Sequence, residues 1–289
     1  MMRLMMRLLM MRLLRFVAVF LFCVLAQTVW PKAVWGQTPP AAAPDEDLTL
    51  QPLEPDFTLV NLPTTLRLPV HKSNFHLTHR FYGNLRDGSF GHQLSNLFGL
   101  DNGAAIGFEY RFAVMKHVQA AAYRTNLDRE TEFYAKFDPI AQSEHSENVP
   151  LSISALLSVE GANNFRRNRS PALGAVVSRR IADIAQVYAT PVWVHNTAVG
   201  AVTRETGFIG LGGRVHVRSS MYLLAEVSPR VGGYAPGPAE YSFALEGRVG
   251  YHVFQMNFSN TTGTTFAQTA RGGAPHSLFL GFNLARKFY

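Results

Sequence analysis

Cysteine is almost absent from this chain, whose 289 residues include only Cys23. Cys23 lies in an apolar run, residues 16–26, that follows an arginine-rich start, a pattern typical of an export signal peptide. The run is too short to cross a bilayer as a helix. Phe22 precedes the cysteine, whereas a lipidated cysteine needs a small residue there, so lipidation is disfavoured. Removal of this segment leaves no thiol and excludes disulfides, cysteine-ligated zinc and thiol catalysis.

A strong excess of charge is also lacking outside that segment. The formal net charge is +7, but five basic residues and no acidic residue precede residue 37, so the balance from there onward is +2. This removes the main support for a nucleic-acid partner. Cleavage after Ala26 or after Gly36 is compatible with the pattern, and Gly36 is favoured because it also removes two apolar tryptophans. The predicted signal peptide therefore covers residues 1–36.

Known metal-binding and haem-binding motifs are missing. The chain has no CxxCH and no HExxH motif. His76 and His79 are three positions apart, so on a strand they would point to opposite faces. The least unfavourable metal cluster combines His216 with Glu226 and Arg214, and its arginine argues against a cation. We predict no metal and no cofactor.

A hydrolytic site is also poorly supported. Barrel phospholipases place a serine two positions after a histidine on an outward-facing strand, because base and nucleophile must meet within hydrogen-bond reach. The nearest arrangements here are His76 with Thr78 and His145 with Ser143, and neither is His-x-Ser. A membrane hydrolase is therefore the weakest of the functions considered, and we predict that the protein is not an enzyme.

Proline is concentrated in residues 37–70, where it is mixed with acidic residues. These prolines are Pro39, Pro40, Pro44, Pro52, Pro55, Pro63 and Pro69. Each proline removes a backbone donor and restricts the chain to extended conformations. We predict a periplasmic lead-in to the folded domain, residues 71–289. A simple linker is favoured over a partner-binding tail, because proline-rich composition is nonspecific.

Short stretches of alternating apolar and polar residues follow and predict twelve strands. They cover residues 74–81, 104–112, 118–125, 131–137, 151–160, 172–180, 185–195, 206–217, 221–229, 241–249, 252–259 and 276–288. In the fifth stretch, for example, Leu157 and Val159 share one face while Ser158 and Glu160 share the other. Abundant phenylalanine, tyrosine and glycine also fit many short strands better than helices.

The connections between these strands favour a closed, antiparallel, up-and-down transmembrane β-barrel over a soluble β-sandwich. Short and long connections alternate, as in outer-membrane barrels with short periplasmic turns and long outer loops. Two connections depart from this alternation. The connection at residues 126–130 is short on the outer side, and the connection at residues 138–149 is long on the inner side. A sandwich would show the same alternation with its apolar face inward. The export signal and the even strand count add to the case for an outer-membrane barrel.

The last predicted strand carries an apolar face that includes Leu280, Phe282, Leu284 and Phe288, interrupted by Arg286. Such a strand suits the closing strand of an outer-membrane barrel. It resembles the C-terminal signal of that class, except that Tyr289 follows the expected terminal aromatic residue. We therefore expect the barrel-assembly machinery to be a partner through this strand, and outer-membrane lipid to surround the barrel.

Several stretches resemble an uncharacterised family of bacterial envelope β-barrels, catalogued as a domain of unknown function. They are HLTHRF (76–81), LFGLD (97–101), GFEY (107–110), GGR (212–214) and HVFQMNFSNTTG (252–263), the last being the most specific. The likeness runs from about residue 57 to the end. It implies a barrel in the outer membrane and supplies no catalytic residue.

The alternation also predicts which polar side chains face the lumen. They are Arg80, Glu109, Arg111, Glu160, Arg214, His216, Glu226, Glu246 and Arg248, together with Gln255 and Asn257. Because an isolated charge away from water is costly, this balanced set of arginines and glutamates should pair across the lumen. A plug of ion pairs and an open permeation path both remain compatible with the pattern.

One predicted outer loop is basic and contains Arg166, Arg167 and Arg169. These arginines suit the phosphates of lipopolysaccharide or another anionic ligand, although a solvated loop would also carry such charges. Three functions follow in order of preference. They are a conduit or binding barrel for small solutes or apolar ligands, a structural or assembly barrel with a plugged lumen and a periplasmic partner, and a membrane hydrolase.

Overall fold

The computed structural model describes residues 53–142, 149–197 and 204–289. The predicted signal peptide, the first part of the proline-rich segment and the His145–Ser143 pair lie outside these residues. The strands are β1 Ser73–Asn84, β2 Ala104–Met115, β3 Val118–Thr125, β4 Thr131–Ile140, β5 Ser152–Gly161, β6 Arg167–Ile181, β7 Ala185–Val194, β8 Thr206–Arg218, β9 Met221–Ser228, β10 Arg230–Gly233, β11 Glu240–Val249, β12 His252–Ser259 and β13 Phe279–Phe288. Short helices are α2 Phe90–Ser95, η3 Leu97–Asn102, η4 Leu127–Arg129, α3 Ala162–Phe165 and α4 Phe266–Arg271.

Twelve of these strands close into one antiparallel ring, which confirms the predicted barrel. Consecutive strands pair with each other from β1 to β9 and from β11 to β13. The ring is completed because β9 also pairs with β11 and β1 also pairs with β13. The closing pair runs in register from Ser73 opposite Phe288 to Arg80 opposite Gly281. A closed ring has no free strand edge, which excludes the two-layer sandwich.

The additional strand β10 continues β9 after a break at Pro229. Proline has no backbone N–H to donate to the ladder, so β9 ends at Ser228. The carbonyl of Pro229 still accepts a hydrogen bond from the N–H of Ile209 at 3.0 Å. The chain then pairs again with β8, with Arg230 opposite Phe208. The predicted ninth strand, 221–229, is therefore extended by one short segment.

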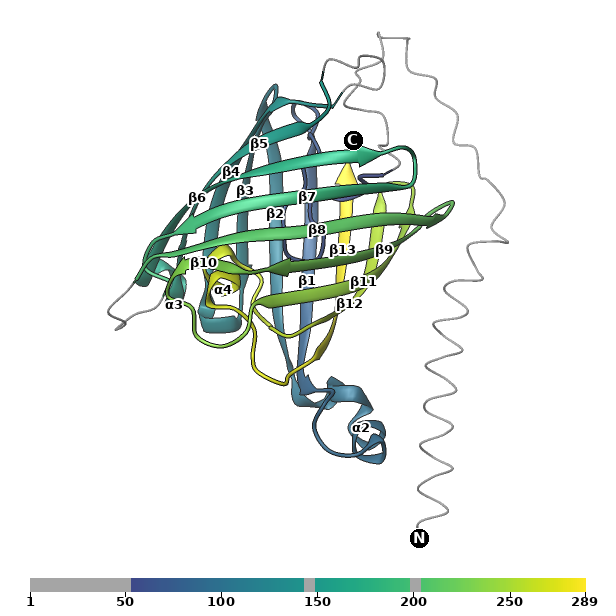
Figure 1. Cartoon of the computed structure of the whole chain (residues 1–289), viewed down its shortest axis with the longest axis vertical. Coiled ribbons are helices and arrows are strands. Elements are labelled where there is room, and N and C mark those ends of the chain that lie inside the picture. Colours follow the sequence, from purple (N-terminus) through teal and green to yellow (C-terminus); the bar gives the residue numbers. More distant parts are fainter. Residues whose placement is uncertain (1–52, 143–148, 198–203) are drawn as a thin grey trace. The chain divides into compact units, whose positions relative to one another are not determined.

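The two ends of the barrel differ in their connections, as predicted. At one end, called the turn end here, the chain starts β1 and finishes β13, and short turns join β2 to β3, β6 to β7, β8 to β9 and β11 to β12. At the other end, the loop end, the β1–β2 and β12–β13 connections are long and carry α2, η3 and α4, whereas the β5–β6 connection with α3 covers only residues 162–166. Figure 1 shows the C-terminus at the turn end and α2 beyond the loop end. The β3–β4 connection, with η4, is equally short, and at the turn end the β4–β5 connection is long and covers residues 141–151.

The outer surface of the ring is apolar. Phe108, Leu157 and Phe243 are 50, 60 and 44 % exposed although they belong to regular strands. Their strand neighbours Glu109, Ser158 and Ala244 are buried. This arrangement places large apolar side chains where lipid hydrocarbon would contact them. Among the described residues, no helix has the length and apolar character needed to cross a bilayer.

Candidate functional site: a lumen closed by two segments

A hairpin formed by residues 53–70, called the hairpin plug, lies inside the barrel. Its two legs are joined through Thr58 and Pro63, with the N–H of Leu59 donating to the carbonyl of Leu62 at 2.7 Å. Phe57, Leu59 and Leu62 are fully buried. We expected residues 37–70 to be a lead-in outside the barrel, and for the described part of that range this was wrong. The segment has few internal backbone hydrogen bonds, and side chains on the barrel wall supply the missing partners.

The tip of the hairpin plug is bound by one carboxylate on β9. Oxygen Oε1 of Glu226 accepts from the N–H of Asn61 at 2.8 Å, and Oε2 accepts from the N–H groups of Val60 and Leu62 at 3.0 and 3.2 Å. The carbonyl of Val60 accepts in turn from Nδ2 of Asn283 at 3.0 Å. Three successive donors therefore converge on one buried carboxyl group, which fixes the turn in the lumen.

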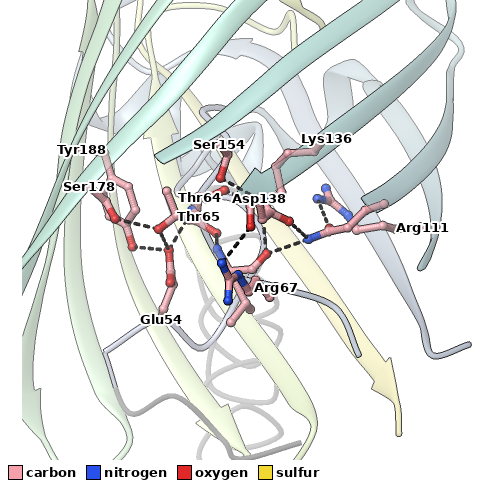
Figure 2. Close-up of polar contacts among 12 residues, drawn as sticks. Glu54, Thr64, Thr65, Arg67, Arg111, Lys136, Asp138, Ser154, Ser178 and Tyr188 are labelled. Carbon is pink, nitrogen blue, oxygen red and sulfur yellow. Dashed lines mark hydrogen bonds and ion pairs between the residues drawn. The ribbon is translucent and has the colours of Figure 1, made fainter. Parts of the chain in front are cut away.

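The legs of the hairpin plug are held from two sides of the lumen, as Figure 2 shows. On the β4 side, Nζ of Lys136 donates to the carbonyls of Thr64 and Leu66 at 2.9 and 2.7 Å and pairs with Asp138 at 3.0 Å. On the β6 side, the hydroxyls of Thr65 and Ser178 lie 2.6 Å apart. The second leg of the plug is thus bound to β4 and β6 of the wall.

Glycines on β8 make room for the apolar side chains of the hairpin plug. A Cβ atom placed on Gly210 would lie 2.6 Å from Cδ2 of Leu62, and one on Gly212 would lie 2.5 Å from Cδ1 of Leu59. Both distances are too short for an ordinary contact, so any larger residue there must displace the leucine. The inner wall at β8 and the plug are therefore complementary in shape.

A second segment, the loop helix α4, occupies the lumen from the loop end. Thr265 and Gln268 form a capping box at its start. Glu160 of β5 accepts from the Thr265 hydroxyl and from the N–H of Ala267, both at 3.0 Å. Ala267 is fully buried and belongs to the same apolar cluster as Leu59 of the plug. The two segments thus share one core inside the barrel.

Little space is left between the two segments. The remaining cavity measures about 40 Å³ and is lined by both segments and by β1 to β4, including His76, Glu109 and Tyr123. A cavity of this size holds a few water molecules and no larger solute. The hairpin plug and α4 therefore leave little room for a solute between them.

The residues predicted to face the lumen lie on the inner side of the ring, but only some of them pair with each other. Arg111 contacts Glu109 at 2.7 Å, and Arg214 contacts Glu246 at 2.9 Å. Arg80, Glu160, Glu226 and Gln255 bind the hairpin plug, α4 or their neighbours instead. Asn257 is buried and contacts Gln255 at 3.3 Å. His216 and Arg248 are partly exposed near the turn end, and His216 stacks on Tyr222 at 5.1 Å.

Several functional side chains were missed by the sequence analysis. Lys136, Asp138 and Glu132 alternate with Phe133 and Phe137 along β4, so the strand periodicity that marked the other lumen residues would have found them. The plug residues Glu54 and Asn61 could not be found in this way, because the hairpin has no regular alternation. Their partners, Tyr188 at 3.1 Å from Glu54 and Glu240 at 3.2 Å from Asn61, lie more than 100 positions away in the chain.

The predicted outer-loop basic patch lies at the loop end, but only Arg166 belongs to the β5–β6 connection, because Arg167 and Arg169 are part of β6. Arg166, Arg167 and Arg169 are all exposed, and the guanidinium of Arg169 lies 5.9 Å from the ring centre of Phe165. Nearby, burial and the adjacent Glu160 carboxylate raise the pKa of Glu130 to about 7. Within the described part of the chain, no group of three or more His, Cys, Asp or Glu residues could hold a metal ion.

A closed, lipid-exposed barrel with an internally filled lumen defines a β-barrel membrane protein. The chain belongs to the family described as membrane bound beta barrel domain (DUF5777), whose model matches residues 56–288. The match begins inside the hairpin plug, so the family domain includes most of the plug as well as the wall. No protein of curated function matches the chain.

Solved barrels of related shape include two porins and a channel. The KdgM porin is 8 % identical, with 75 % of this chain and 99 % of that chain covered and a TM-score of 0.48. An outer membrane channel from Pseudomonas putida F1 is 10 % identical over 77 % and 97 %, with a TM-score of 0.47. The NanC porin is 7 % identical over 75 % and 99 %, with a TM-score of 0.46. At these scores the likenesses carry no argument about solute or mechanism.

Proposed function

We propose that the protein is a gated conduit for small solutes in the bacterial outer membrane, closed by its own hairpin plug. The observation that carries the proposal is how the plug is held. Lumen side chains such as Glu226 and Lys136 bind its backbone N–H and carbonyl groups. Water can replace either partner in such a hydrogen bond, so the net cost of separating them is modest.

The direction of plug movement follows from the topology. The second leg of the hairpin plug leads through residue 70 into β1 at the turn end, while the tip at Val60 and Asn61 is bound further along the lumen by Glu226 of β9. Withdrawal toward the turn end would therefore follow the direction in which the second leg runs into β1. In an outer-membrane barrel the short turns face the periplasm, so the plug would leave on the periplasmic side.

The outer-membrane location is supported by three features together. These are the predicted signal peptide at 1–36, the apolar belt on the outside of the ring, and the aromatic-rich closing strand β13. We expect the assembly machinery of that membrane to receive the chain through β13 and outer-membrane lipid to cover the belt.

A permanently closed structural barrel is the second candidate, because the lumen holds buried ion pairs and two packed segments. Arg214 with Glu246 and Lys136 with Asp138 are almost fully buried. Both cations also donate to plug carbonyls, Arg214 to Thr58 and Lys136 to Thr64, so withdrawal would remove hydrogen-bond partners from buried charges, which favours a fixed plug. Under this alternative the plug stays in place and the lumen conducts nothing.

A reversible disulfide between plug and wall separates the two candidates. Thr65 and Ser178 have hydroxyl oxygens 2.6 Å apart, so Thr65→Cys with Ser178→Cys places two thiols within bonding reach. For the gated conduit, planar-bilayer recordings should show no openings when the pair is oxidised and discrete openings after reduction. Each single cysteine variant serves as the control, and its conductance should be the same under oxidising and reducing conditions. Silence in both states of the double variant, with the single variants equally silent, would rule the conduit out.

A further inference from the structure

A second pocket, of about 550 Å³, opens at the loop end of the barrel and is separate from the small internal cavity. Connections far apart in the chain form its wall: the β3–β4 turn with η4, the α3 turn with the start of β6, Thr197 after β7, and the end of α4. Its lining is mainly polar and includes Asn126, Asn163 and Asn168.

The charges in this pocket are unbalanced. Arg129, Arg167 and Arg271 line it against a single acidic residue, Asp128. A guanidinium presents several N–H donors in a plane and matches the two oxygens of a carboxylate or the oxygens of a phosphate. Three such groups around one opening, with asparagine amides between them, form a site suited to an anion.

Arg271 is held in position with its present partner only weakly engaged. Its Nε donates to the carbonyl of Thr197 at 2.9 Å, which orients the side chain toward the pocket. Its terminal nitrogen lies 3.7 Å from Asp128, and the two side chains are 32 and 58 % exposed. An ion pair with this separation and this exposure contributes little to stability. An incoming anion can therefore replace Asp128 as the partner of Arg271.

The pocket also adjoins one of the two segments that close the lumen. Arg271 is the last residue of α4, whose Ala267 and Ala270 are fully buried among the lumen side chains. A ligand bound to Arg271 would therefore contact the helix that blocks the barrel from the loop end.

We propose that this pocket binds a carboxylate or phosphate group arriving at the loop end, through Arg129, Arg167 and Arg271. The group can belong to a free solute or to a lipid headgroup. That such a solute is the one the conduit admits rests on the proposed function, whereas the binding itself does not depend on it.

The test uses the full-length protein in detergent, titrated by calorimetry at constant ionic strength with inorganic phosphate and with succinate. We expect saturable binding of at least one of them. Arg129→Gln with Arg167→Gln should weaken it at least about tenfold, because charge-assisted hydrogen bonds are lost. The matched control is Arg166→Gln with Arg169→Gln, which removes the same charge from the same rim, outside the pocket lining, and should change affinity less than about twofold.

A second arm titrates the same proteins with detergent micelles containing lipid A, and with lipid A stripped of its phosphates. Phosphate-dependent binding that is lost in the pocket variant supports the site and assigns it to a lipid headgroup. The proposal is overturned if neither free anion nor phosphorylated lipid A saturates the protein. Equal weakening by the pocket and control variants would overturn it as well.

Folding is checked by the heat-dependent gel mobility of the barrel, which all variants should retain. Arg129 and Arg167 are exposed, so their replacement leaves the wall and plug intact. No conductance is measured in these titrations, so a failed anion site and a failed conduit give different results.

Discussion

The N–H of Asn61 lies 2.8 Å from Oε1 of Glu226, so the tip of the hairpin plug is tied to a strand 165 positions further along the chain. Two more N–H groups reach the other oxygen of the same carboxylate. The Glu226 carboxylate and these three N–H groups thus satisfy one another inside the barrel. The closed lumen is therefore a tertiary arrangement, and each of its contacts can be tested by substitution.

Replacing Glu226 with glutamine should loosen the plug. The amide nitrogen would face the N–H groups of Val60 or Asn61 as a second donor, leaving buried donors without acceptors, at a cost of about 2–3 kcal/mol. Amide hydrogen exchange across residues 59–62 should accelerate by roughly 30-fold or more. Glu205→Gln, at an exposed carboxylate, is the control and should leave these amides unchanged. Unaltered exchange in the Glu226 variant would show that the carboxylate does not hold the tip.

Gly210→Val should open the barrel by displacing Leu62. The new side chain would begin only 2.6 Å from the leucine, and overpacking of this kind costs about 1–3 kcal/mol. We expect more frequent openings in planar bilayers than for the unaltered protein. Gly213→Val, where the nearest atom to a new Cβ is 3.5 Å away, is the matched control on the same strand. Equal behaviour of the two variants would mean that the plug does not depend on the shape of β8.

Removal of one partner of the buried Arg214–Glu246 pair should destabilise the barrel strongly. Both side chains are fully buried, and an uncompensated buried charge costs about 3–5 kcal/mol. Glu246→Gln should therefore lower the urea midpoint of unfolding in detergent. The exposed pair of His195 and Glu205 should contribute less than about 1 kcal/mol, so Glu205→Gln provides the comparison. Similar midpoints for the two variants would contradict a structural role for the buried pair.

Stability at the loop end should fall as the pH rises through about 7, the value to which burial raises the pKa of Glu130. The unfolded chain releases the proton of this carboxyl group near its ordinary pKa of about 4.3, whereas the folded protein keeps the proton up to a higher pH. Protonation therefore stabilises the folded state fully below about pH 4.3, and this stabilisation is lost as the carboxyl group ionises in the folded protein. The decline in unfolding midpoint between pH 5 and 8 should be smaller in Glu130→Gln. An equal decline in both proteins would argue against this assignment.

The strands of the barrel wall could be predicted from the sequence because the alternation of apolar and polar residues is a local pattern within each strand. Strands β3 and β12 begin and end at the predicted residues, and Ala104 and Thr206 begin β2 and β8 as predicted. The period-2 alternation, with apolar residues such as Leu157 outward and Glu160 inward, identified the two faces of the sheet. Turn lengths then separated a closed barrel from a sandwich.

The contents of the barrel were decided only by the tertiary structure. The balanced lumen charges predicted pairing across the lumen, and Glu246 does contact Arg214 on β8, yet Glu226 binds backbone N–H groups of the plug instead. The proline-rich sequence of residues 53–70 indicates an extended chain and contains no signal for a lumen position. Its place is set by hydrogen-bond partners and by the space beside glycines on several strands of the wall. These strands would lie hundreds of ångströms apart in an extended chain, and they come together only when the ring closes.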